Sequence, residues 1–199
     1  NLYGATKLTS DRLFVSGNSY TGSHNTSFSV VRYGNVMGSR GSVIPFFLSI
    51  AKDGVLPITD NRMTRFMISL EDGVELVWHA FDNMKGGEIY VKKIPSMKVT
   101  DVALAVNKNS KQEEVGIRPG EKLHEQMIGI EDALYTYEYP AHFKILPSIN
   151  DWAKDKTRIG DGIRVPEDFV YTSDNNKEWM KISELQDWIE TNKNKIGNI

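Results

Sequence analysis

The sequence predicts an α/β fold, because helical and extended patterns alternate along the chain. Residues 3–17 place apolar side chains among polar ones, as expected of a helix. Residues 27–33 (SFSVVRY) are β-branched and aromatic, which predicts a buried strand. This strand runs into the glycine-punctuated loop 34–41. Ligands of open α/β sheets bind beyond the carboxyl ends of the strands, so the loop is a candidate ligand edge. An ordinary strand-to-helix turn is the local alternative.

The alternation continues through the rest of the chain. Helices are expected at 42–52, 70–84, 100–106, 123–127 and 183–191, and extended segments at 55–59, 88–91, 115–117 and 135–145. Residues 107–114 (NKNSKQEE) are polar and are expected to form a loop. Within the helix at 70–84, large apolar side chains recur at helical spacing and predict a stripe that faces the core: Val74, Val77, Trp78 and Phe81.

Composition excludes several classes of function. With 199 residues, 40% of them hydrophobic, the chain can bury a sizeable core. The formal net charge of -2 gives no signal for nucleic acid, and the absence of cysteine excludes a disulfide framework or a Cys-ligated metal. The four histidines lack the spacing of a metal site, so no metal is expected. No apolar run approaches the roughly 18 residues of a membrane span, and no charged-then-apolar leader opens the chain, so we expect a cytoplasmic protein with no membrane partner.

Tyr3 and Lys7 are the first candidates for catalysis. They are four residues apart in the first predicted helix, so their side chains rise from one face, one turn apart. A lysine ammonium favours a neighbouring tyrosinate and can bring the phenol towards a working general base. Such a pair suits removal of a proton from an alcohol while hydride leaves the same carbon. The same spacing also arises by chance in many proteins.

Three arginines lie beside predicted turns: Arg40, Arg65 and Arg118. A guanidinium presents a planar fork of donors that matches phosphate oxygens. Glu121 follows Arg118 by three residues, so a carboxylate could accept from ribose hydroxyls while the arginine meets a diphosphate. The alternative is an acid favoured at a helix start next to a surface arginine.

Four motifs come in one order: Tyr3 and Lys7, RYGNVMGSRGSVIPFF at 32–47, LPITDNRMTRFMI at 56–68 and GIRPGEKLHEQMI at 116–128. This order resembles the C-terminal half or more of extended short-chain dehydrogenase/reductase enzymes that act on nucleotide sugars, and within them the 4,6-dehydratases. The segments IPSMK (94–98) and DFVYTSDNNKEW (168–179) extend the resemblance to almost the whole chain. It implies the C-terminal part of a Rossmann-like doubly wound sheet plus a small α/β substrate-binding lobe. The implied parts are the remainder of the dinucleotide-binding domain at 1–41, mainly the substrate lobe at 42–149, and a C-terminal extension at 150–199.

The resemblance also implies roles for individual residues. Tyr3 and Lys7 would be catalytic and would contact the ribose and nicotinamide of NADP. The loop expected along the nicotinamide consists of Val36, Met37, Gly38, Ser39 and Arg40. The expected substrate contacts are Asn35, Val43, Thr59 near the uracil, the diphosphate-binding Arg65 and Arg118, and the ribose-binding Glu121.

The implied reaction is NADP-dependent dehydration of UDP-N-acetylglucosamine. Oxidation at C4 allows water to leave across C5 and C6, and hydride returns to C6 with inversion at C5, on a route to pseudaminic acid or a related surface glycan. In the family, a glycine-rich turn and a Thr-Asp-Lys segment precede the tyrosine, and this sequence contains neither. We therefore expect a C-terminal fragment that is inactive alone, from a full-length protein that forms a homo-oligomer. A UDP-sugar 4-epimerase, a non-catalytic sugar-nucleotide or NADP sensor, and a plain interaction domain are the alternatives.

Overall fold

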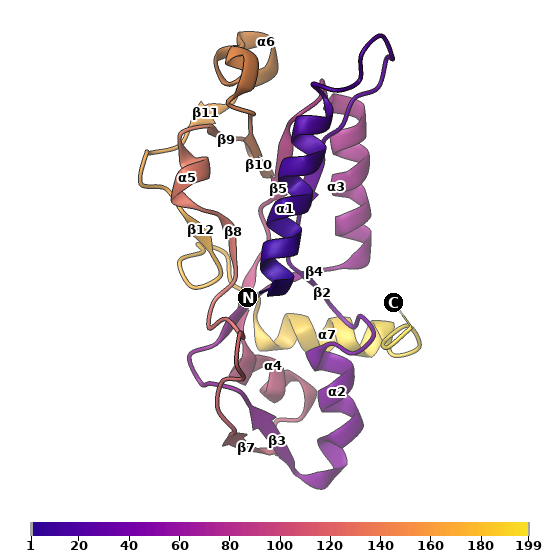
Figure 1. Ribbon diagram of the computed structural model, residues 1–199. Coiled ribbons are helices and arrows are strands. Elements are labelled where there is room, and N and C mark those ends of the chain that lie inside the picture. The colour runs from indigo at the N-terminus through magenta and orange to yellow at the C-terminus, as the bar shows by residue number, and fades with distance from the viewer. Residues whose placement is uncertain (1, 199) are drawn as a thin grey trace. The chain divides into compact units, whose positions relative to one another are not determined.

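The computed structural model describes residues 2–198, apart from the side chains of Tyr3, Ile149 and Asn150 (Figure 1). The chain forms two compact units. Unit 1 comprises Asn1–Tyr33, Glu71–Lys93 and Gln126–Tyr171, and unit 2 comprises Gly34–Leu70, Ile94–Glu125 and Thr172–Ile199. Both units combine helices with strands, which confirms the predicted α/β class. The functional division at residues 41 and 149 stays a prediction.

A mixed five-stranded sheet is the framework of unit 1. Its strands lie in the order β1 (Val30–Arg32), β5 (Ile89–Lys92), β10 (His142–Ile145), β9 (Thr136–Glu138) and β11 (Ile163–Arg164). β1 and β5 are parallel, and the other neighbouring strands are antiparallel. A parallel pair requires a long crossover connection. Here the crossover between β1 and β5 contains the Gly34–Leu70 segment of unit 2. The chain therefore leaves unit 1 after β1 and returns to it before β5.

The helices of unit 1 flank short strands and turns. They are α1 (Leu2–Gly17), α3 (Leu70–Asn83), α5 (Ile130–Ala133), the 3-10 helix η2 (Ile149–Lys154) and α6 (Lys156–Ile159). Two further short strands, β8 (Gln126–Ile128) and β12 (Tyr171–Thr172), pair with each other in a separate two-stranded sheet. α3 packs on the sheet through the small side chain of Ala80 and through Leu76, which form one buried cluster with Tyr90 of β5.

The apolar stripe predicted to be the core face of α3 is wrong. Val74 and Val77 are each 45% exposed, and Trp78 and Phe81 are 61% and 65% exposed. The buried line of this helix is instead made by Gly73, Leu76 and Ala80. Both lines of side chains have helical spacing, and no described residue covers the line with the larger side chains, which includes Trp78 and Phe81. Burial of the smaller side chains lets α3 lie close to the sheet.

Unit 2 contains two small sheets and a shared hydrophobic core. β4 (Thr64–Ile68) lies between the parallel β2 (Asn35–Val36) and the antiparallel β6 (Ser96–Lys98), while β3 (Val55–Ile58) pairs in parallel with β7 (Lys111–Glu114). The helical segments are α2 (Val43–Ile50), the 3-10 helix η1 (Ala51–Asp53), α4 (Val99–Val106) and α7 (Ile182–Asn192). α2, α4 and α7 bury Phe47, Val102 and Leu185 in one core cluster.

Three local predictions between residues 107 and 128 are wrong. Residues 111–114 form β7 instead of a loop, because β3 supplies a parallel partner for this polar sequence. The strand expected at 115–117 is absent, and the pairing ends where the amide of Val115 donates to the Ile58 carbonyl at 2.8 Å. Residues 123–127 do not form a helix, and 126–128 belong to β8. Long-range pairing outweighs local propensity at 111–114 and 126–128, whereas residues 115–117 lack a partner strand.

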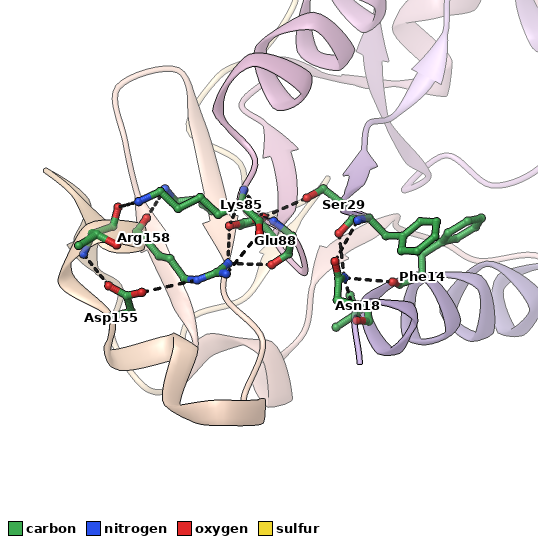
Figure 2. A network of polar contacts seen from close by, with 12 residues as sticks. Phe14, Asn18, Ser29, Lys85, Glu88, Asp155 and Arg158 are labelled. Carbon is green, nitrogen blue, oxygen red and sulfur yellow. Dashed lines mark hydrogen bonds and ion pairs between the residues drawn. The ribbon is translucent and has the colours of Figure 1, made fainter. Parts of the chain in front are cut away.

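A buried polar network joins the turn after α3 to the segment that contains α6 (Figure 2). Glu88 is 2% exposed, and its carboxylate accepts from Arg158 Nη1 (2.7 Å), Ser29 Oγ (3.0 Å) and the Gly86 amide (2.8 Å). The Arg158 guanidinium also donates to the Gly86 carbonyl at 2.7 Å and lies 4.2 Å from the centre of the Trp152 ring. The network therefore fixes residues 152–158 to the start of β5.

The first prediction concerns this network. Arg158→Ala removes the cation from a buried carboxylate, so we expect the free energy of unfolding to fall by about 3 kcal/mol. Urea denaturation measures the change. Lys154→Ala is the control, because its ion pair with Asp151 in the same unit is 84% and 85% exposed and should contribute less than about 1 kcal/mol. Equal losses in the two variants would show that the network is not a major source of stability.

Candidate functional site

The expected cofactor and substrate residues are divided between the two units. Tyr3 and Lys7 belong to α1 of unit 1, whereas every expected residue from Asn35 to Glu121 belongs to unit 2. The helical backbone places positions 3 and 7 one turn apart, as predicted. Lys7 is exposed, and the side chain of Tyr3 lies outside the described residues. The pairing of their functional groups stays a prediction.

The loop expected to line the nicotinamide begins as a strand. Asn35 and Val36 form β2, and the Met37 amide extends the pairing by donating to the Ile68 carbonyl at 2.9 Å. Met37 is 5% exposed and belongs to the core cluster. Gly38 has a φ of 71°, and a Cβ atom there would lie 2.8 Å from the Trp188 ring, so this position requires glycine.

The polar end of this loop is more accessible. Ser39 is half-buried, and its amide donates to the Val36 carbonyl at 3.3 Å. Asn35 and Arg40 are exposed, so their side chains can meet a ligand. Val43, the first residue of α2, is half-buried. Their contacts with cofactor or substrate stay predictions.

Thr59 directly follows β3 and lies beside a charged turn that the sequence did not reveal. Thr59 is half-buried, and the next side chain, Asp60, is 5% exposed. Asp60 Oδ1 accepts from the Arg62 amide (2.8 Å) and Nε (3.0 Å), and Oδ2 accepts from Nη2 (2.7 Å). These bonds from Arg62 lower the pKa of Asp60 to about 2, so it is ionised at neutral pH. The turn that follows Thr59 is thereby fixed.

Arg65 lies on β4 with a largely buried guanidinium, whose side chain is 14% exposed. Nη1 donates to the carbonyls of Thr64 (2.7 Å) and Leu123 (3.1 Å), and Nη2 donates to the Lys122 carbonyl at 3.0 Å. Nε lies 3.5 Å from Glu125 Oε1. Burial lowers the pKa of Arg65, and the carboxylate of Glu125 opposes this shift. Arg65 therefore binds the main chain of residues 122 and 123 and faces the side chain of Glu125, and its expected contact with a diphosphate stays a prediction.

Arg118 and Glu121 are brought together by a turn that closes on itself. The Glu121 amide donates to the Arg118 carbonyl at 3.0 Å, and the Arg118 amide donates to Glu121 Oε2 at 3.3 Å. Gly120 has a φ of 80°, in the region that favours glycine. Arg118 is exposed and Glu121 is half-buried. This geometry gives one accessible guanidinium beside one carboxylate, which suits a phosphate next to a hydroxylated sugar.

Sequence reasoning missed the polar residues that hold the segment after this turn. Thr64, His124 and Ser173 form a hydrogen-bonded cluster in unit 2. His124 was considered only as a metal ligand, and Ser173 lies 109 residues from Thr64 in the sequence. The presence of 168–179 among the segments that carry the family resemblance was the one signal for Ser173.

Two cavities lie in unit 1, and the expected site residues line neither. One has a volume of about 220 Å³ and includes Arg12 and Asp132. The other has a volume of about 380 Å³ and includes Tyr90, His142 and Lys144. Among the described residues, no three potential metal-ligating side chains gather in one place. In the same part of the chain, every helix is too short or too polar to cross a membrane.

Comparison with known proteins places these features in a family. Residues 1–147 match the family model described as polysaccharide biosynthesis protein. The chain is 53% identical to UDP-N-acetylglucosamine 4,6-dehydratase (inverting) of Campylobacter jejuni subsp. jejuni serotype O:2, over 93% of this chain and 58% of the relative. It is 35% identical to UDP-glucose 4-epimerase of Rickettsia rickettsii, over 96% of this chain and 57% of the relative.

A solved structure also resembles this chain over most of its length. The X-ray structure of Pen from Bacillus thuringiensis is similar with a TM-score of 0.83 and 36% identity, covering 97% of this chain and 59% of that chain. This chain thus spans less than two thirds of the relatives that it matches. The family match over residues 1–147, together with these relatives, confirms the resemblance: the chain belongs to the polysaccharide biosynthesis protein family, within the extended short-chain dehydrogenases/reductases.

Proposed function

We propose that the full-length protein is a sugar-nucleotide 4,6-dehydratase that acts on UDP-N-acetylglucosamine with NADP. The observation that carries this proposal is the 53% identity to the Campylobacter jejuni dehydratase over 93% of the chain. The 35% identity to a UDP-glucose 4-epimerase makes epimerisation the second candidate. The proposed product is a 4-keto-6-deoxy sugar nucleotide inverted at C5, used for pseudaminic acid or a related surface glycan in the cytoplasm.

Within each unit, exposed cations support the proposed cofactor, one on α1 and one in the loop after β2. Lys7 and Arg40 are exposed cations, which suit the hydroxyl and phosphate oxygens of a dinucleotide. NADP, when bound, supplies hydride acceptance and return. Tyr3 would hold and move the proton of the substrate 4-hydroxyl, and Lys7 would favour the tyrosinate. The positions of these residues one turn apart on α1 support this division of roles.

The proposed substrate fits the turn at 118–121 in unit 2. The exposed Arg118 would bind the diphosphate, and Glu121 would accept from a ribose hydroxyl. The sequence contains neither the glycine-rich turn nor the Thr-Asp-Lys segment of the family. We therefore propose that the 199-residue chain alone does not catalyse the reaction.

The second prediction tests this function. Full-length protein with NADP should convert UDP-N-acetylglucosamine to a 4-keto-6-deoxy product, followed by NMR. Tyr3→Phe should lower kcat by about 10²-fold or more, because it removes the proton-accepting oxygen. Arg118→Ala should raise KM with a smaller effect on kcat, because the diphosphate contact is already present in the bound substrate. Lys154→Ala is the control. Formation of a C4 epimer would favour the epimerase, and turnover by the 199-residue chain alone would contradict its proposed inactivity.

We also propose that the full-length protein is a homo-oligomer. The support is the apolar face of α3 that no described residue covers, where Val74, Val77, Trp78 and Phe81 are 45–65% exposed. The rings of Trp78 and Phe81 meet edge-on, with centroids 6.1 Å apart. An apolar patch of aromatic side chains is typical of a protein–protein interface.

The third prediction concerns this face. Trp78→Glu places a charge in the apolar patch, so we expect the full-length protein to dissociate at concentrations where the wild type is associated. Sedimentation velocity measures the change. Asp82→Lys is the control, because Asp82 is exposed on the same helix and lies outside the patch. An unchanged oligomer in Trp78→Glu would exclude this face as the interface.

A further inference from the structure

The segment at 122–125 links the turn of Arg118 and Glu121 to β8 without forming a helix or strand. Its main chain is held on one side by β4. The Thr64 amide donates to the Leu123 carbonyl at 3.2 Å. Arg65 donates to the carbonyls of Leu123 (3.1 Å) and Lys122 (3.0 Å). These bonds give partners to carbonyl groups that are not paired within a helix or a sheet.

Ser173 holds the same segment from its other end. The Ser173 amide donates to the Glu125 carbonyl at 2.8 Å, and the Glu125 amide donates to Ser173 Oγ at 2.9 Å. Both main-chain groups of Glu125 are thus bonded to one residue. Ser173 is 0% exposed, so water cannot replace these bonds without opening the structure.

A hydroxyl pair connects the two sides. Thr64 Oγ1 lies 2.6 Å from Ser173 Oγ and 2.8 Å from His124 Nδ1. Thr64 is 3% exposed. Ser173 Oγ accepts from the Glu125 amide and keeps its own proton for donation. Two acceptors of Thr64 are within reach of that proton: the side-chain Oγ1, and the main-chain carbonyl at 3.2 Å from Ser173 Oγ. The Thr64 proton is then available to His124.

We infer that Thr64 and Ser173 are positioning residues for the nucleotide end of the substrate. Their paired hydroxyls, here called the hydroxyl clamp, hold residues 122–125 and so set the place of the turn that carries Arg118 and Glu121. The inference rests on the proposed function for its substrate, a nucleoside diphosphate sugar. The two hydroxyls contact neither Arg118 nor Glu121, so their effect on the turn passes through residues 122–125.

A role in the clamp predicts different effects for two substitutions of Thr64. Thr64→Val keeps the branched shape of the side chain and removes the hydroxyl, whereas Thr64→Ser keeps the hydroxyl. A role in filling the core predicts that valine is tolerated better than serine. A role in the clamp predicts the reverse, because valine leaves Ser173 and His124 without their shared partner.

The fourth prediction measures this distinction in the full-length protein. Thr64→Val should raise KM for UDP-N-acetylglucosamine by about 5- to 10-fold, the effect of losing one or two buried hydrogen bonds, with kcat within about twofold. Thr64→Ser should remain near the wild-type KM, and Ser173→Ala should behave like Thr64→Val. Thr191→Val is the control, because it removes an exposed hydroxyl of α7 in the same unit.

Hydrogen–deuterium exchange provides a reading that does not depend on turnover. Amides of residues 118–125 should exchange about tenfold faster in Thr64→Val and Ser173→Ala than in Thr64→Ser or the wild type. Unchanged exchange, an unchanged KM in Thr64→Val, or equal impairment by serine and valine overturns the clamp. Absence of turnover in the wild type overturns the proposed function instead. In that event the clamp is tested by hydrogen–deuterium exchange and by calorimetric titration with UDP. Thr64→Val and Ser173→Ala should again be impaired, and Thr64→Ser should again resemble the wild type.

Discussion

The main chain of residues 122–125 needs hydrogen-bond partners from outside the segment, and this need organises much of unit 2. Residues 123–125 are half-buried and lie outside helices and strands, so bonds from other elements take the place of regular main-chain pairing. β4 provides the Thr64 amide and the Arg65 guanidinium, and the C-terminal part of the chain provides Ser173. The position of the substrate turn therefore depends on residues of β4 and of the C-terminal part of the chain, which lie far from the turn in the sequence.

The same principle operates in unit 1 with a charge in place of main-chain groups. The buried carboxylate of Glu88 is satisfied by Arg158, and this bond attaches the segment around α6 to the start of β5. Ser173 and α7, farther along the same C-terminal region, belong to unit 2. Residues 150–199 are therefore divided between both compact units, and each unit depends on them for the partners of buried polar groups.

Local sequence patterns predicted the elements whose own residues have a clear periodicity or β-branched composition. The helix at α1, the strand at β1 and the helix at α7 follow from spacing and composition. The polar sequence of β7 gave no such indication, because its partner β3 lies more than fifty residues earlier. The face of α3 was misassigned because helical spacing does not state which of two apolar lines meets the sheet. Thr64 and Ser173 were beyond local reasoning, since only the folded chain brings them together.

The two arginines expected at a diphosphate have different surroundings, and this separates their roles. Arg65 is bonded to three main-chain carbonyls and faces Glu125, so its buried charge is already compensated. Three of the five N–H groups of Arg65 donate to these carbonyls, so a phosphate bound by Arg65 would have to use its remaining donors. Arg118 is exposed on the adjacent turn. The exposed Arg118 is therefore free of this constraint, whereas Arg65 also holds residues 122 and 123, and the expected contact of each arginine with a diphosphate stays a prediction.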